Sequence, residues 1–153
     1  MICIATHSID VKPLSFDEMV ARALYSDFNS DITEEVFPLQ RVKPGKVSLV
    51  TICFGKQVED AHVLMWREKF GLQPVAMDHI LTLGYNMGWQ DPDKPVWLVN
   101  IDVSGITRRG KSVRPYLYSD RNKEKGKFFR DLRLMEVNSG LYAPESQFLS
   151  LDA

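Results

Sequence analysis

The feature that most constrains the fold of this chain is residues 95–137, where three alternating or apolar runs are separated by two short connections. The connections, ITRRGK and RNKEKGK, are basic, and each contains a glycine. Short connections of this kind between alternating runs are typical of antiparallel strands joined by hairpins. The stretch therefore predicts a β-meander, and it contains no motif that identifies a reaction.

The rest of the chain predicts helices and additional strands. Ser15 and Glu18 form a capping-box pattern at the start of an amphipathic helix, and Gly71 and Pro74 mark the end of a second helix and the start of a third. Helices are expected over 16–28, 58–70 and 74–86, and further strands over 2–5, 46–54 and 147–151. This order predicts an α+β fold with a mostly antiparallel or mixed sheet of about five to six strands, and with three helices packed on one face.

Composition supports one globular domain. The chain has 153 residues, of which 44% are hydrophobic and 25% are charged, values typical of a folded domain with a sizeable core. We therefore expect a single α+β domain over 1–153. The start, MICIATHSID, lacks the basic and apolar segments of a secretory signal, and no run approaches the roughly 20 apolar residues that cross a bilayer. The expected location is cytoplasmic, without membrane contact.

A total net charge of −1 conceals one strongly basic segment. Residues 105–133 carry ten Lys and Arg against three Asp and Glu, a net charge of +7. Alternation along the second and third runs of the meander places aromatic and basic side chains on one face, and the connections add further cations. The candidate contact residues are Arg108, Arg109, Lys111, Arg114, Tyr116, Tyr118, Arg121, Lys123, Lys125, Phe129 and Arg133.

Cations beside flat rings suit a single-stranded nucleic acid, because cations contact phosphates while rings stack on bases. The same cations would equally contact an acidic protein surface, or they are solvated turns that prevent edge-to-edge aggregation. An oligomer formed through faces that carry Trp and Met is a further alternative. The leading hypothesis is a non-enzymatic binding module that uses residues 105–133 to contact a polyanion, such as nucleic acid, or an acidic protein.

The alternative hypothesis is a small enzyme or metal protein centred on Cys53, His62 and His79. Cys53 ends a predicted strand before a helix, where a thiolate is stabilised, and a histidine would supply the base. Glu59 and His62 have the spacing of half a carboxylate-bridged metal site, but no second helix repeats it. No metal and no cofactor are predicted, and Cys3 and Cys53 are expected to be buried, reduced thiols.

Overall fold

The computed structural model describes residues 2–86, 88–122, 126–137 and 141–152. Within them, the chain forms one mixed sheet of eight strands, in the order β1-β3-β8-β4-β6-β7-β2, with β5 paired to β6. The strands are β1 (Cys3–Val11), β2 (Asp27–Phe28), β3 (Gly45–Cys53), β4 (Val96–Val99), β5 (Gly105–Ile106), β6 (Ser112–Asn122), β7 (Lys127–Glu136) and β8 (Ser146–Asp152). The predicted α+β class is confirmed, and the sheet is larger than expected.

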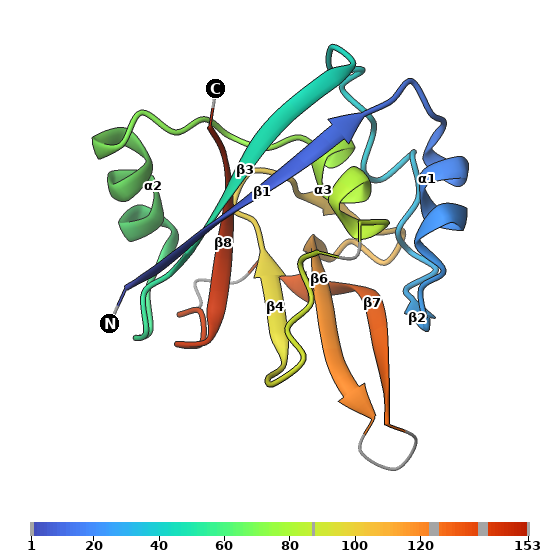
Figure 1. Ribbon diagram of the computed structural model, residues 1–153. Helices are drawn as coiled ribbons and strands as arrows, with labels where there is room; N and C mark the ends of the chain where they lie inside the picture. The colour runs from blue at the N-terminus through green and yellow to red at the C-terminus, as the bar shows by residue number, and fades with distance from the viewer. Residues whose placement is uncertain (1, 87, 123–125, 138–140, 153) are drawn as a thin grey trace.

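The meander is also present. β4 pairs with β6 and β6 pairs with β7, both antiparallel, and the β6–β7 hairpin extends away from the rest of the sheet (Figure 1). β8, the last strand in sequence, lies in the middle of the sheet, antiparallel to β3 and parallel to β4. The pairing of β4 with β8, like that of β2 with β7, makes the sheet mixed.

Helices cover both faces of this sheet. The described residues contain α1 (Phe16–Ala23), α2 (Asp60–Lys69) and α3 (Met77–Gly84). Leu49 and Leu149 share a core with α1 and α3, whereas Val50 and Phe148 share a second core with α2. Successive side chains of a strand point to opposite faces, so α2 lies on the face opposite α1 and α3 (Figure 1). The three helices were expected on one face, and that expectation is wrong. We refer to the two sides as the α2 face and the α1/α3 face.

Three strands differ from the sequence prediction. β1 continues to Val11 as an edge strand, and its second half alternates, with Ile9 and Val11 buried in the core and Ser8 and Asp10 exposed, a pattern that the predicted strand over 2–5 missed. β2 and β5 have two residues each, too few for any periodicity. The first helix ends at Ala23 rather than residue 28, because Leu24 adopts a left-handed conformation with φ of 51° and the chain then enters β2. None of the described helices has the length and apolar composition to cross a membrane.

Two buried polar side chains organise the start of α3. Asp78 accepts hydrogen bonds from the backbone N–H of Gln40 at 2.8 Å and of Val42 at 3.4 Å, which holds this loop against the helix. His79 Nδ1 accepts from the N–H of Ala76 at 2.9 Å, and this bond requires an unprotonated Nδ1. Burial lowers the pKa of His79, and the neighbouring Asp78 carboxylate partly opposes that effect.

A buried ion pair fixes α2 to the sheet. Arg67 is 5% exposed, and its guanidinium donates to both carboxylate oxygens of Asp102, at 2.5 and 2.8 Å. It also donates to Ser150 Oγ at 3.1 Å, on the central strand β8. Asp102 in turn accepts from the backbone N–H of Val75 at 3.0 Å. One pair of side chains therefore joins α2, β8 and the segment that leads into α3.

We predict that the free energy of unfolding decreases as pH falls below about 6.5, the ordinary pKa of histidine. Burial lowers the pKa of His79 and of His7, so the unfolded chain binds protons before the folded chain does, and stability is complete only above that pH. His79→Gln keeps an acceptor for the Ala76 N–H but does not titrate. Urea denaturation from pH 5 to 8 should show a weaker pH dependence in this variant. An unchanged dependence would contradict the assignment.

We also predict that Asp102→Ala lowers the free energy of unfolding by about 3–5 kcal/mol, because Arg67 is left buried without its counter-ion. The matched control is Glu34→Ala, which removes the exposed pair of Arg41 and Glu34, 3.3 Å apart. That control should cost less than about 1 kcal/mol. Urea denaturation measures both, and equal losses would show that the Arg67 pair does not anchor α2.

Candidate functional site

Three aromatic rings form a strip on the α2 face of the meander. Trp97 on β4 lies directly opposite Tyr118 on β6, with ring centroids 5.2 Å apart. The ring of Phe129 on β7 follows, 5.8 Å from that of Tyr118. All three side chains are partly exposed. We refer to Trp97, Tyr118 and Phe129 as the aromatic strip. Alternation along β6 and β7 predicts two of its rings, and the β4–β6 register adds the third.

Arg133 adds a positive plane to the strip. Its guanidinium carbon lies 4.4 Å from the centroid of the Tyr118 ring, and its Nη2 donates to Asp131 at 2.5 Å. Asp131 is 1% exposed and also accepts from the N–H of Asp27 at 3.0 Å, so the carboxylate is held in place. Burial alone would lower the pKa of Arg133, but the bond to Asp131 outweighs it and the pKa is raised. The guanidinium therefore stays charged, with its side chain 38% exposed.

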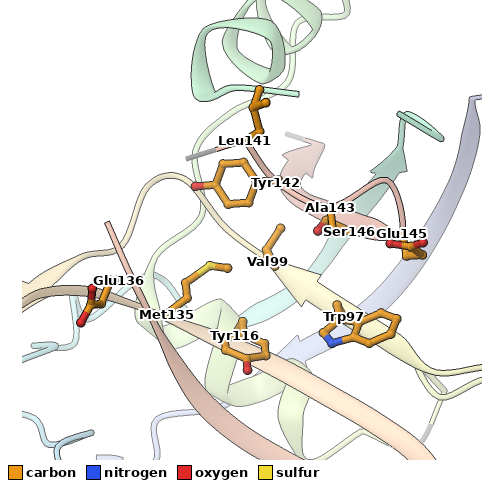
Figure 2. A pocket seen from close by; sticks show the side chains of 10 residues that line it. All are labelled: Trp97, Val99, Tyr116, Met135, Glu136, Leu141, Tyr142, Ala143, Glu145 and Ser146. Carbon is orange, nitrogen blue, oxygen red and sulfur yellow. The ribbon is translucent and has the colours of Figure 1, made fainter. Parts of the chain in front are cut away.

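A pocket of about 370 Å³ adjoins the strip and shares Trp97 with it. Figure 2 shows Val99, Tyr116 and Met135 on the strand side of the pocket, with the segment 141–146 across from them. Most of the lining is apolar or aromatic, which is typical of ligand pockets. Two carboxylates, those of Glu136 and Glu145, also line it, and that of Glu136 is paired with Lys111. No sequence pattern indicates this pocket, because segment 141–146 reaches it from outside the meander.

Arg114 was predicted as a contact residue, and the structure places it inside the protein. Its side chain is 11% exposed and makes two hydrogen bonds to Asp60 in the first turn of α2, at 2.9 and 3.1 Å. It also donates to the hydroxyl of Tyr142. Burial, assisted by Asp60, raises the pKa of Tyr142 to about 12, so this hydroxyl remains protonated at neutral pH. Arg114 therefore joins β6, α2 and the segment at Tyr142, and its charge is already matched.

The remaining predicted cations do not share one surface. Arg108 and Arg109 lie in the turn before β6, whereas Arg121 and Lys127 lie near its other end. The strand between them has 11 residues, a separation of roughly 36 Å at about 3.3 Å per residue. Successive turns of a meander occupy opposite ends of the strand they share, so the expected single basic surface is wrong. Lys123 and Lys125 fall outside the described residues.

Two further cations of the basic segment already have partners within the protein. Lys111 forms an exposed ion pair with Glu136 at 3.1 Å. Arg130 points to the α1/α3 face and donates to the carbonyl of Gly84 at 3.2 Å, at the end of α3, where a positive charge is favourable. Ion pairing and strand alternation thus reduce the cations on the face of the aromatic strip to Arg133 and Lys127, because Arg121 lies opposite Phe128 in the register and points to the α1/α3 face. Sequence counts alone cannot show this reduction.

The residues of the alternative hypothesis do not converge. His62 lies on α2 and packs edge-on against Phe54, with ring centroids 4.8 Å apart. His79 lies on α3, across the sheet from His62. Cys53 ends β3, and its thiol donates to the carbonyl of Pro144 at 3.3 Å. Within the described part of the chain, no group of three or more His, Cys, Asp or Glu side chains is arranged to hold a metal ion.

The two cysteines are also less buried than expected. Cys3 is exposed and Cys53 is intermediate, so the expectation of two buried thiols is wrong. The strands that carry them are neighbours, and the two residues are direct partners in the β1–β3 register. Neither relation can be read from sequence, because strand order is set by tertiary packing.

If Arg114 serves to dock α2, its effect on stability should depend on Asp60. We predict a coupling energy of about 1–2 kcal/mol in a double-mutant cycle of Arg114→Ala and Asp60→Ala. The control cycle, Lys111→Ala with Glu136→Ala, breaks an exposed pair and should give less than about 0.5 kcal/mol. Urea denaturation supplies the free energies. If the losses in free energy of unfolding are additive, Arg114 and Asp60 are not coupled, and Arg114 is then available to contact a partner.

Comparisons with protein-family models, with curated proteins and with solved structures found no match to this chain. Any functional assignment therefore depends on the chain's own side chains. Among the described residues, the aromatic strip with Arg133 and the adjoining pocket is the arrangement whose chemistry points most directly to a ligand.

Proposed function

We propose that this protein is a non-catalytic binding module for single-stranded nucleic acid, and that the aromatic strip is its contact surface. The observation that carries the proposal is the row of Trp97, Tyr118 and Phe129 across three neighbouring strands, with partly exposed rings and adjacent centroids 5.2 and 5.8 Å apart. Rings displayed on a sheet stack on unpaired bases whatever their sequence, because every base has a flat face. A duplex, whose bases are already stacked, offers no such contact.

The charges around the strip support this choice. Arg133 covers the Tyr118 ring, and a guanidinium plane stacks on a base much as an aromatic ring does. Lys127 is exposed and shares a strand face with Phe129, two residues along β7, so it is placed to meet a backbone phosphate. Arg121, on the neighbouring strand of the same hairpin, lies opposite Phe128 and points to the other face, so it does not belong to this surface. A nucleic acid lying along this arm would meet rings at its bases and cations at its phosphates.

The pocket gives one base a deeper site. It opens beside Trp97, and the carboxylate of Glu145 accepts hydrogen bonds from the amino groups of bases, whereas that of Glu136 is paired with Lys111. An unstacked base therefore enters with its backbone outside. An acidic protein surface would contact the same cations, but it would make no use of the exposed rings or of the pocket. For that reason nucleic acid is favoured over an acidic protein.

The test is a titration of fluorescently labelled single-stranded and double-stranded oligonucleotides at low and moderate salt. We predict tighter binding of the single strand, with log K falling by about 1.4 per unit of log salt, because two cations, Lys127 and Arg133, neutralise about two phosphates. Phe129→Ala should weaken binding roughly ten-fold or more, the usual effect of losing one stacking ring. Circular dichroism should show that this variant remains folded.

The chain provides a matched control for charge. Lys127→Ala should weaken binding and reduce its salt dependence, whereas Arg109→Ala, at the far end of β6, should leave binding within about two-fold. Both variants remove one positive charge from the protein. Equal losses would indicate unspecific attraction by net charge, and flat titrations at low salt would exclude nucleic acid as the ligand.

A further inference from the structure

Cys3 and Cys53 face each other across the β1–β3 ladder. They are direct partners in the antiparallel register, so their side chains project to the same face of the sheet. Both are free thiols. Directly opposed residues of antiparallel strands have Cα atoms about 4.5 or 5.5 Å apart, and a disulfide requires about 4.4–6.8 Å. The two cysteines can therefore be joined without a movement of the strands.

The surroundings allow a small molecule to reach the pair. Both cysteines line a groove of about 730 Å³, whose other side includes Trp89 and Lys94. β1 is an edge strand, and Cys3 at its start is exposed. Cys53 is less accessible, and its thiol donates to the carbonyl of Pro144 at 3.3 Å, a bond that requires its proton. This difference assigns the first attack to Cys3 and the second to Cys53.

We propose that Cys3 and Cys53 form a redox-active dithiol whose substrates are low-molecular-weight disulfides. The Cys3 thiolate attacks one sulfur of the external disulfide, whose S–S bond breaks, and one thiolate leaves. Cys53 then loses its proton to solvent, and its thiolate attacks Cys3 Sγ of the mixed disulfide and expels the second thiolate. The two leaving thiolates take up the two protons released by the cysteines. The protein loses two electrons and gains one S–S bond, and the external disulfide is reduced to two thiols.

The fold accounts for why this pair should react together. Cys3 and Cys53 are 50 positions apart in the sequence, so the unfolded chain must close a long loop to join them. The β1–β3 register holds them side by side, and the folded chain has already lost that entropy. The equilibrium constant for disulfide formation should therefore be roughly 30-fold or more higher in the folded protein than in the urea-unfolded protein.

The experiment uses oxidised glutathione as the probe. The reduced protein is equilibrated with glutathione redox buffers, with and without urea, trapped by alkylation of free thiols and weighed as intact protein. The expected product of the folded protein is a monomer that has lost two hydrogen atoms and has no alkylated thiol. Its thermal midpoint should rise by roughly 5–10 °C on oxidation.

Single variants test the order of attack. Cys53→Ser should accumulate a mixed disulfide with glutathione at Cys3, and Cys3→Ser should form far less mixed disulfide at Cys53. The proposal is overturned if the folded protein ends with two glutathione adducts, with two free thiols or as a disulfide-linked dimer, or if urea does not change the equilibrium constant. The groove shares Trp97 with the aromatic strip, but both cysteines point to the α1/α3 face and the variants leave the strip unchanged, so disulfide formation can be tested separately from nucleic-acid binding.

Discussion

The structure depends on one constraint, which is that the central strands of the sheet are apolar on both sides. β3 presents Leu49 to one core and Val50 to the other, and β8 does the same with Leu149 and Phe148. Such strands must be shielded on two faces. Helices α1 and α3 shield one face and α2 the other. The core beneath α2 has fewer residues than the core beneath α1 and α3, and the Arg67–Asp102 pair also joins α2 to the sheet.

Coverage by α2 also decides where the protein is open. The helix covers the part of its face near β3 and β8, with Arg114 and Asp60 fixing its first turn. The neighbouring part of that face, over β4, β6 and β7, carries the aromatic strip and the pocket. The three rings of the aromatic strip therefore remain partly exposed, beside the guanidinium of Arg133, which the buried carboxylate of Asp131 holds in place. The proposed binding surface is the part of the α2 face that α2 leaves uncovered.

Local signals in the sequence predicted much of this fold. The capping box of Ser15 and Glu18, the alternation along β6 and β7 and the apolar run of β3 all correspond to observed elements. The two-sided apolar character of residues 46–54 was itself a sign that both faces needed cover. Strand order, however, depends on contacts between residues that are distant in sequence. No local sequence pattern therefore indicates that β8 inserts between β3 and β4.

The same distinction applies to the sites. Alternation placed Tyr118, Phe129 and Arg133 on one face, which the register bears out, because period-two patterns fix side-chain direction. Alternation cannot tell whether a cation has a partner. Arg114 meets Asp60 from a segment 54 residues away in sequence, so its burial required knowledge of where α2 packs. The opposition of Cys3 and Cys53 likewise follows from register between distant strands.

The central position of β8 has a consequence for how the chain acquires its structure. Residues 146–152 lie between β3 and β4, so these two strands have no common neighbour until that segment has left the ribosome. Until then, apolar strand edges on both sides of the gap are open to other chains. Completion of the sheet therefore requires the synthesis of residues 146–152, and a nascent chain halted before Ser146 should be prone to aggregation and a ready target for chaperones.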